Sequence, residues 1–274
     1  MSALVPLTAK QRGGLLRGAL CAAPGMRLVV CDFSGIEARV LAWLAEDHAA
    51  IDVFRRKIDP YKRIASEAIF FVPVEEITKQ QRAVGKVAEL ALGYQMGWRK
   101  FEANAGKAML ESQGVTAQQV VDQWRNLRQP VVDFWERMRR GWVSESDMFH
   151  RREDDGSLRL TLPSGRELVY RDATREGYRR KEGLVTRVYG GLLTENLVQA
   201  ASRCLLAHSM VLAHDAGLRI VTTVHDEIVC EEPERDADEA LEVLEYCMSE
   251  EAMPDWAEGC PITCEGYTAE RYRK

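Results

Sequence analysis

The chain has 274 residues, of which 46% are hydrophobic and 29% charged, so it can bury a substantial core in one large domain or two ordinary ones. It contains no low-complexity tract and no apolar run long enough to cross a bilayer, and its N-terminus lacks the apolar segment of a signal peptide. Its seven cysteines are scattered and odd in number, which favours a reducing compartment over a disulfide framework. We therefore expect a cytoplasmic location.

The net charge of −5 argues mildly against a simple nucleic-acid-binding protein, because neutralising phosphates requires a basic surface. The charge is unevenly distributed, however, and residues 231–251 carry much of the acidity. Basic clusters occupy the middle of the chain: Arg137, Arg139 and Arg140; Arg151 and Arg152; Arg179, Arg180 and Lys181. An acidic chain can thus still present a basic cleft, although each cluster alone is equally compatible with a solvated helix face.

In chain order, the first predicted element is a buried strand over residues 26–33, which reaches an aspartate near its end. Residues 36–46 then carry apolar side chains at helical spacing. A second helix begins at Pro60 and ends before Pro73.

A longer helix is predicted over residues 79–94, with Thr78 as its N-cap. Residues 117–143 are again helical, with a break or kink at Pro130. Three tryptophans in this stretch are spaced as core residues: Trp124, Trp135 and Trp142.

Residues 158–171 predict a hairpin that turns at Pro163-Ser164-Gly165. A long amphipathic helix follows over 194–216, then two strand-like runs within 219–232 and an acidic helix over 236–251. Since strands and helices do not alternate regularly, we predict an α+β fold in which helices flank a small antiparallel sheet.

Two aspartates stand out as candidate metal ligands, because each lies where an apolar strand ends or turns. Asp32 ends the first strand, and Asp226 lies where the last two strands meet. A carboxylate there is costly unless it is paired or bound to a metal, and two such groups form a hard oxygen site that suits Mg²⁺. An aspartate at a strand end is more often a turn residue, so this pattern alone is weak.

The helix over 79–94 offers a second candidate site. Arg82, Lys86 and Leu90 are four residues apart and share one helix face, which could hold a triphosphate and cover a sugar and base. The alternative for an isolated helix is a solvated basic stripe beside a buried leucine. Carboxylates on a sheet and a cationic helix are, in combination, the components of a phosphoryl-transfer site.

Three segments resemble motifs A, B and C of family A DNA polymerases, in that order: DFSGIEARVLAWLAE (32–46), RAVGKVAELALGYQMG (82–97) and VHDEIVCE (224–231). LPSGRELVY (162–170) and TENLVQAASR (194–203) are also similar to family segments. The resemblance runs from Leu16 onward and is strongest to polymerases of phages and prophages. It implies a DNA-directed DNA polymerase with a palm sheet and helical fingers, in a bacterial or phage-infected cell.

The resemblance also implies residue roles. Asp32 and Asp226, with the main-chain carbonyl of Phe33, would bind two Mg²⁺ ions for nucleotidyl transfer. Glu227 would be a catalytic residue near the primer terminus, and His225 would contact the primer backbone.

For the incoming nucleotide, the resemblance implies that Arg82 and Lys86 hold the triphosphate. Glu37 resembles the steric gate that excludes a ribose 2′-hydroxyl, and Tyr94 the tyrosine that pairs with it. Lys62 stands where many members have a phosphate-contacting histidine.

Leu90 replaces the usual aromatic residue of the nucleotide-binding helix and is followed by Ala91 instead of glycine, so sugar discrimination is expected to differ from that of other members. Gln199 and Arg203 would contact the duplex.

The resemblance divides the chain into a first palm part (1–58), fingers (59–157, with the motif B helix at 79–96) and a second palm part (158–274). Family members carry a helical thumb before motif A, and only about thirty residues precede it here; no exonuclease carboxylate cluster is present. We therefore expect thumb and exonuclease domains to be absent, and the grip on primer-template to come from an upstream segment or a second chain.

The sequence thus predicts the catalytic core of a template-directed DNA polymerase, which takes primer-template DNA and dNTPs and has no membrane partner. The main alternative is a non-catalytic or split polymerase-like subunit that acts as an interaction module in a replication or repair complex. A single-subunit RNA polymerase shares the two aspartates and the lysine, but Glu37 and the His225-Asp226-Glu227 triplet favour the DNA enzyme. A histidine–aspartate metal hydrolase is disfavoured by the five histidines and the lack of a second cluster.

Overall fold

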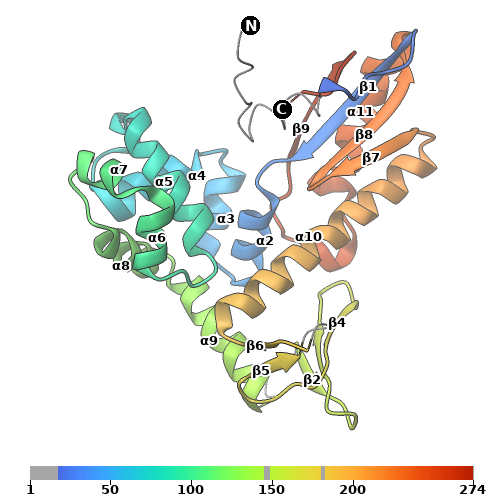
Figure 1. Cartoon of the computed structure of the whole chain (residues 1–274). Helices are drawn as coiled ribbons and strands as arrows, with labels where there is room; N and C mark the ends of the chain where they lie inside the picture. The colour runs from blue at the N-terminus through green and yellow to red at the C-terminus, as the bar shows by residue number, and fades with distance from the viewer. Residues whose placement is uncertain (1–17, 145–148, 180–182, 274) are drawn as a thin grey trace, which may run out of the picture. The chain divides into compact units, whose positions relative to one another are not determined.

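A computed structural model describes residues 18–144, 149–179 and 183–273, which form two compact units (Figure 1). Of these described residues, 18–36, 203–255 and 262–273 belong to the first unit, and those within 37–202 and 256–261 belong to the second. Arg180 and Lys181, of the third basic cluster, lie outside the described residues. No helix in the described part of the chain is long and apolar enough to cross a membrane.

The first unit is built on a four-stranded antiparallel sheet of order β7-β8-β1-β9. Its strands are β1 (Met26–Phe33), β7 (Ile220–Val224), β8 (Glu227–Pro233) and β9 (Cys264–Ala269). Figure 1 shows β1 between β8 and β9, with helix α11 (Ala237–Cys247) alongside β1. The helix contacts both β1 and β9 and covers one face of the sheet.

Strand β1 is buried because it is central in this sheet. Val29, Val30 and Cys31 have no exposed surface, although successive side chains point to opposite faces. Leu28 and Val30 join Val229 in one apolar cluster. The strand that ends at the predicted metal ligand is therefore firmly fixed by its neighbours.

The second unit is mostly helical. Its helices are α2 (Ile36–Leu44, whose first residue falls in the other unit), α3 (His48–Arg55), α4 (Pro60–Ile64), α5 (Lys79–Leu92), α6 (Trp98–Ala105), α7 (Lys107–Ser112), α8 (Ala117–Leu127) and α9 (Gln129–Ser144). A π-helical turn, Ala65–Phe70, continues α4. In the core of the second unit, the indoles of Trp124 and Trp135 stack with ring centroids 6.1 Å apart, and Trp142 is fully buried. The predicted core role of all three tryptophans is confirmed.

Two small antiparallel sheets complete the second unit: β2 (His150–Arg152), β3 (Leu158–Thr161) and β4 (Glu167–Tyr170) form one, and β5 (Gly177–Arg179) and β6 (Val185–Arg187) the other. Helix α10 (Gly190–Asp215) begins in the second unit and ends in the first. The α+β fold with small antiparallel sheets is therefore confirmed. The palm and fingers boundaries stay a prediction.

Several element predictions are confirmed, among them the first strand, the 158–171 hairpin and the Thr78 cap, which forms a full capping box. The helical stretch over 117–143 breaks at Arg128, so that Pro130 falls in the first turn of α9, where its missing amide proton is tolerated. Helix α10 starts at Gly190, four residues earlier than predicted. This start needs glycine, because a Cβ at Gly190 would lie 2.1 Å from the carbonyl oxygen of Trp135.

Candidate active site

Three acidic residues, Asp32, Asp226 and Glu227, lie where β1 ends and β7 turns into β8. The antiparallel register places Asp32 directly opposite Glu227. His225 and Asp226 form the two-residue turn between β7 and β8, and His225 adopts a φ of +57°. The Phe33 amide donates a hydrogen bond to the Asp226 carbonyl oxygen at 3.2 Å. The fold thus brings together the residues predicted as catalytic and metal-binding on the first unit.

The chemistry of this donor set fits a hard divalent cation. Glu227 is 1% exposed, and Asp32 and Asp226 are partly buried. Residues directly opposite on antiparallel strands have neighbouring side chains, so a cation bound there would be close to the carboxyl groups of both Asp32 and Glu227. Among the described residues, no three His, Cys, Asp or Glu side chains gather as a metal-binding group. Mg²⁺ is typically held by one or two carboxylates, with water and substrate phosphate as its other ligands, and Asp32 and Asp226 can supply the two carboxylates.

Helix α5 presents the predicted phosphate-binding cations. Arg82 and Lys86 both lie over the ring of Tyr61 in α4, at 5.1 and 5.7 Å from its centroid. Leu90, further along the helix, is 54% exposed, whereas the opposite face of α5 is buried. Lys62 follows Tyr61 in α4, which packs against α5. Four of the predicted nucleotide-binding residues are thus on α5 and its neighbour α4: Lys62, Arg82, Lys86 and Leu90.

Arg82 is already paired with an acidic residue that the sequence analysis did not single out. Its Nε donates to Oδ2 of Asp59 at 2.6 Å, and Oδ1 of Asp59 accepts the amides of Tyr61 and Lys62 as the N-cap of α4. Partial burial acts to raise the pKa of Asp59, but these hydrogen bonds hold the pKa below its usual value. The Asp–Pro pair at the start of a predicted helix was the available sign of this cap.

Glu37 and Tyr94 meet in the second unit. The Tyr94 hydroxyl donates to Oε2 of Glu37 at 3.0 Å. Burial raises the pKa of Tyr94, and the negative charge of Glu37 raises it further, so the phenol stays neutral and remains a donor. Glu37 itself is exposed. The predicted gate residue and its predicted partner are thus in direct contact.

The predicted DNA contacts lie on exposed positions. His225 is exposed in its turn, and Gln199 and Arg203 are exposed on α10. Gln199 belongs to the second unit, and His225 and Arg203 belong to the first.

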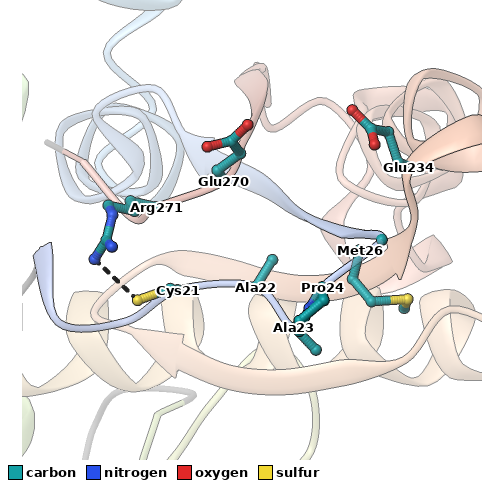
Figure 2. Close-up of a pocket in the computed structure, with 9 residues that line it drawn as sticks. Cys21, Ala22, Ala23, Pro24, Met26, Glu234, Glu270 and Arg271 are labelled. Atoms are coloured by element: carbon teal, nitrogen blue, oxygen red, sulfur yellow. Dashed lines mark hydrogen bonds between the residues drawn. The ribbon is translucent and has the colours of Figure 1, made fainter.

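A separate cavity of about 290 Å³ lies in the first unit at the Met26 end of β1 (Figure 2). Arg271 donates to the Cys21 sulfur at 3.1 Å on its wall, and Glu234 and Glu270 also line it. Six residues of strand, or about 20 Å, separate Met26 from Asp32, so this cavity is not part of the carboxylate site.

Residues 4–153 match the family model described as DNA polymerase family A. The chain belongs to this family. The matched range includes Asp32, Glu37 and the α5 cations, and the family resemblance expected from the sequence motifs is therefore confirmed.

This family A chain is 36% identical to a DNA polymerase of Bacillus phage SP02, over 95% of this chain and 43% of the relative. It is 28% identical to DNA polymerase I of Pseudomonas aeruginosa, over 89% of this chain and 25% of the relative. The chain therefore spans about two fifths of the length of the phage relative and a quarter of the length of the Pseudomonas relative.

Among solved structures, the chain is similar to the POL domain of Pol1 from M. smegmatis in complex with DNA primer-template and dNTP. The TM-score is 0.71 at 20% identity, over 97% of this chain and 43% of that one. This likeness shows that the family A chain has the fold of a polymerase domain.

Proposed function

We propose that this chain is the catalytic core of a template-directed DNA polymerase, which adds deoxynucleotides to a primer 3′ end. One observation supports the proposal above the rest. In a member of family A, the β1–β8 register places Asp32 opposite Glu227, and the adjoining turn carries Asp226. These are the carboxylates that motifs A and C supply.

The first unit would hold the metal. The Asp32 and Asp226 carboxylates and the Phe33 carbonyl would bind two Mg²⁺ ions, which would supply activation of the attacking 3′-hydroxyl and neutralise charge on the leaving pyrophosphate. Glu227, buried opposite Asp32, would place a third carboxyl group near the bound cations. The exposed His225 would donate to the primer backbone, and Arg203 would add a cation for the duplex.

The second unit would hold the nucleotide. Arg82, Lys86 and Lys62 would neutralise the triphosphate, with Leu90 covering sugar and base in place of an aromatic ring. Glu37, kept in place by the Tyr94 hydroxyl, would exclude a 2′-hydroxyl. Gln199 would contact the duplex.

We further propose that additional polypeptide completes the grip on primer-template, either as an upstream segment or as a second chain. The chain's 43% coverage of its phage relative supports this proposal.

The test is Mg²⁺-dependent primer extension by the wild-type chain and Asp226→Asn, with and without the proteins encoded by neighbouring genes. Asp238→Asn is the matched control, because Asp238 is exposed on α11 in the same unit. We expect Asp226→Asn to lose at least about a thousandfold in extension rate with an unchanged circular dichroism spectrum, and the control to stay active. Full extension by Asp226→Asn would overturn the metal assignment. No extension by the wild-type chain in either setting, with DNA binding retained, would favour a non-catalytic subunit.

A further inference from the structure

Three buried charged side chains form a network in the second unit. Arg128 lies between α8 and α9; its Nε is 2.8 Å from Oδ2 of Asp47, and its Nη1 donates to Oε1 of Glu89 at 2.8 Å. The other Glu89 oxygen accepts the Trp124 indole proton at 3.0 Å. The side chains of Arg128, Asp47 and Glu89 are each at most 3% exposed. We call these three residues the buried triad.

The buried triad joins two segments that carry predicted substrate contacts. Glu89 is on α5, three residues after Lys86 and directly before the exposed Leu90. Asp47 caps α3 by accepting the Ala50 amide, and it follows α2, on which Glu37 lies. Arg128 therefore links the helix of the triphosphate cations to the segment after the gate residue.

Such a network constrains geometry more narrowly than apolar packing does. Two carboxylates share one guanidinium, and all three are removed from water, so each contact must be kept if no charge is to be left uncompensated. The Arg128–Glu89 contact is also a hydrogen bond, whose direction restricts the geometry further, whereas the Arg128–Asp47 contact is an ion pair. Through Arg128, the buried triad therefore connects α5 to the segment between α2 and α3.

Two more contacts hold the chain just after α5. The Trp135 indole donates to the Gly93 carbonyl at 2.8 Å, and Arg125 donates to the Met96 carbonyl at 3.2 Å. Arg125 is on α8 and Trp135 is on α9, and Arg128 lies at the junction between these two helices. Tyr94 lies between these two anchored carbonyls, so its hydroxyl is held where it meets Glu37.

We propose that the buried triad positions α5 for nucleotide selection. By fixing α5 against α2, it would set the Tyr94–Glu37 contact and the placement of Arg82 and Lys86. No triad residue is exposed enough to touch a nucleotide, so Glu89, Arg128 and Asp47 are positioning residues. The proposal rests on the proposed polymerase function and deepens it.

The test compares single-nucleotide insertion of dATP and ATP by the wild-type chain, Glu89→Gln and Asp47→Asn, together with any partner that extension requires. Glu89→Gln removes a charge and keeps an acceptor for Trp124. Glu46→Gln is the matched control, since Glu46 adjoins Asp47 but forms an exposed, 3.7 Å pair with Arg137. We expect KM for dATP to rise about tenfold in both triad variants, kcat to change less than about threefold, and discrimination against ATP to fall about tenfold. Glu46→Gln should match the wild type within about twofold.

A second readout does not depend on activity. Amide exchange of residues 79–94 should quicken about tenfold in both triad variants, while residues 26–33 of the other unit keep wild-type protection. Asp47→Glu preserves the charge at this position, so it should keep most of the wild-type discrimination against ATP that Asp47→Asn loses. If Glu89→Gln does not fold, Asp47→Asn provides both measurements.

Wild-type discrimination and KM in folded Glu89→Gln or folded Asp47→Asn would overturn the proposal. So would equal losses of protection in residues 26–33 and 79–94, because they would indicate a general loss of stability. If the wild-type chain does not extend primers at all, the proposed function fails, whereas amide exchange still shows whether the buried triad fixes α5.

Discussion

Replacing Arg128 by methionine should destabilise the second unit strongly. Methionine fills much of the same volume but leaves Asp47 and Glu89 buried without their shared cation. Removing one partner of a buried ion pair costs about 3–5 kcal/mol. Two carboxylates lose their partner here, but Glu89 keeps the Trp124 hydrogen bond and Asp47 keeps the Ala50 amide. We therefore expect a loss of about 4 kcal/mol at pH 8, within that range.

The sign of the pH dependence follows from the same geometry. Without Arg128, burial should raise the pKa of both carboxyls in the folded variant above their unfolded values. The folded variant then takes up protons as the pH falls, so its deficit relative to wild type should shrink between pH 8 and pH 5. Exposed pairs behave differently, and Glu46→Gln should cost less than about 1 kcal/mol at either pH.

Urea unfolding followed by tryptophan fluorescence suits this measurement, because Trp124 and Trp135 are in the same unit as the mutated side chain. A deficit below about 1 kcal/mol, or one that is equal at pH 5 and pH 8, would refute the reasoning. It would mean that the buried triad is solvated in solution.

Two further predictions concern the nucleotide-binding residues. Glu37→Ala should raise ribonucleotide incorporation about tenfold or more in primer extension, because the side chain that meets Tyr94 is removed; unchanged selectivity would place the gate elsewhere. Asp59→Asn keeps an N-cap for α4 but loses the charge that pairs with Arg82. Since the pKa of Asp59 is lowered in the folded chain, its stabilisation is present at neutral pH and is lost as the pH falls below about 4. The two proteins should therefore differ in urea midpoint at pH 7 and converge in acid, and a constant difference would contradict this account.

The sequence predicted those parts of the site whose signal is local. Runs of apolar residues that end at an aspartate predicted strand β1 and the β7–β8 hairpin. The order of the three motifs indicated that Asp32 and Asp226 belong to one site. The register that sets Asp32 opposite Glu227 needed the structure, because strand pairing is a tertiary property.

The buried triad could not be predicted in the same way. Arg128 lies two residues before Pro130 and has the pattern of an ordinary helix-terminal cation, and its partners Asp47 and Glu89 are 81 and 39 positions away in the chain. Charged residues are almost never fully buried, so neither Glu89 nor Asp47 suggested a core position. The three-residue strands β5 and β6 were missed for another reason, because so few residues show no periodicity.

Gly85 shows most directly how tertiary packing reverses a sequence-based expectation. It lies inside α5, where replacement by alanine should raise helix stability by about 1 kcal/mol on propensity alone. A Cβ at this position, however, would lie 2.2 Å from the Tyr61 carbonyl oxygen and 3.1 Å from the Ala65 Cβ. The main chain of α4 cannot rotate away as a side chain could, so α4 and α5 would have to separate.

We therefore predict that Gly85→Ala lowers the urea midpoint, with an overpacking cost of about 1–3 kcal/mol that exceeds the propensity gain. Ala83→Gly, at an exposed position of the same helix, should also destabilise, by about 1 kcal/mol, so opposite substitutions two residues apart should act in the same direction. Separation of the helices would also move the Tyr61 ring away from Arg82 and Lys86, so KM for dNTPs should rise in Gly85→Ala and not in Ala83→Gly. If Gly85→Ala unfolds at a higher urea concentration than the wild type, the α4–α5 contact has room for the added methyl group. In that case Tyr61 would not hold Arg82 and Lys86 in place.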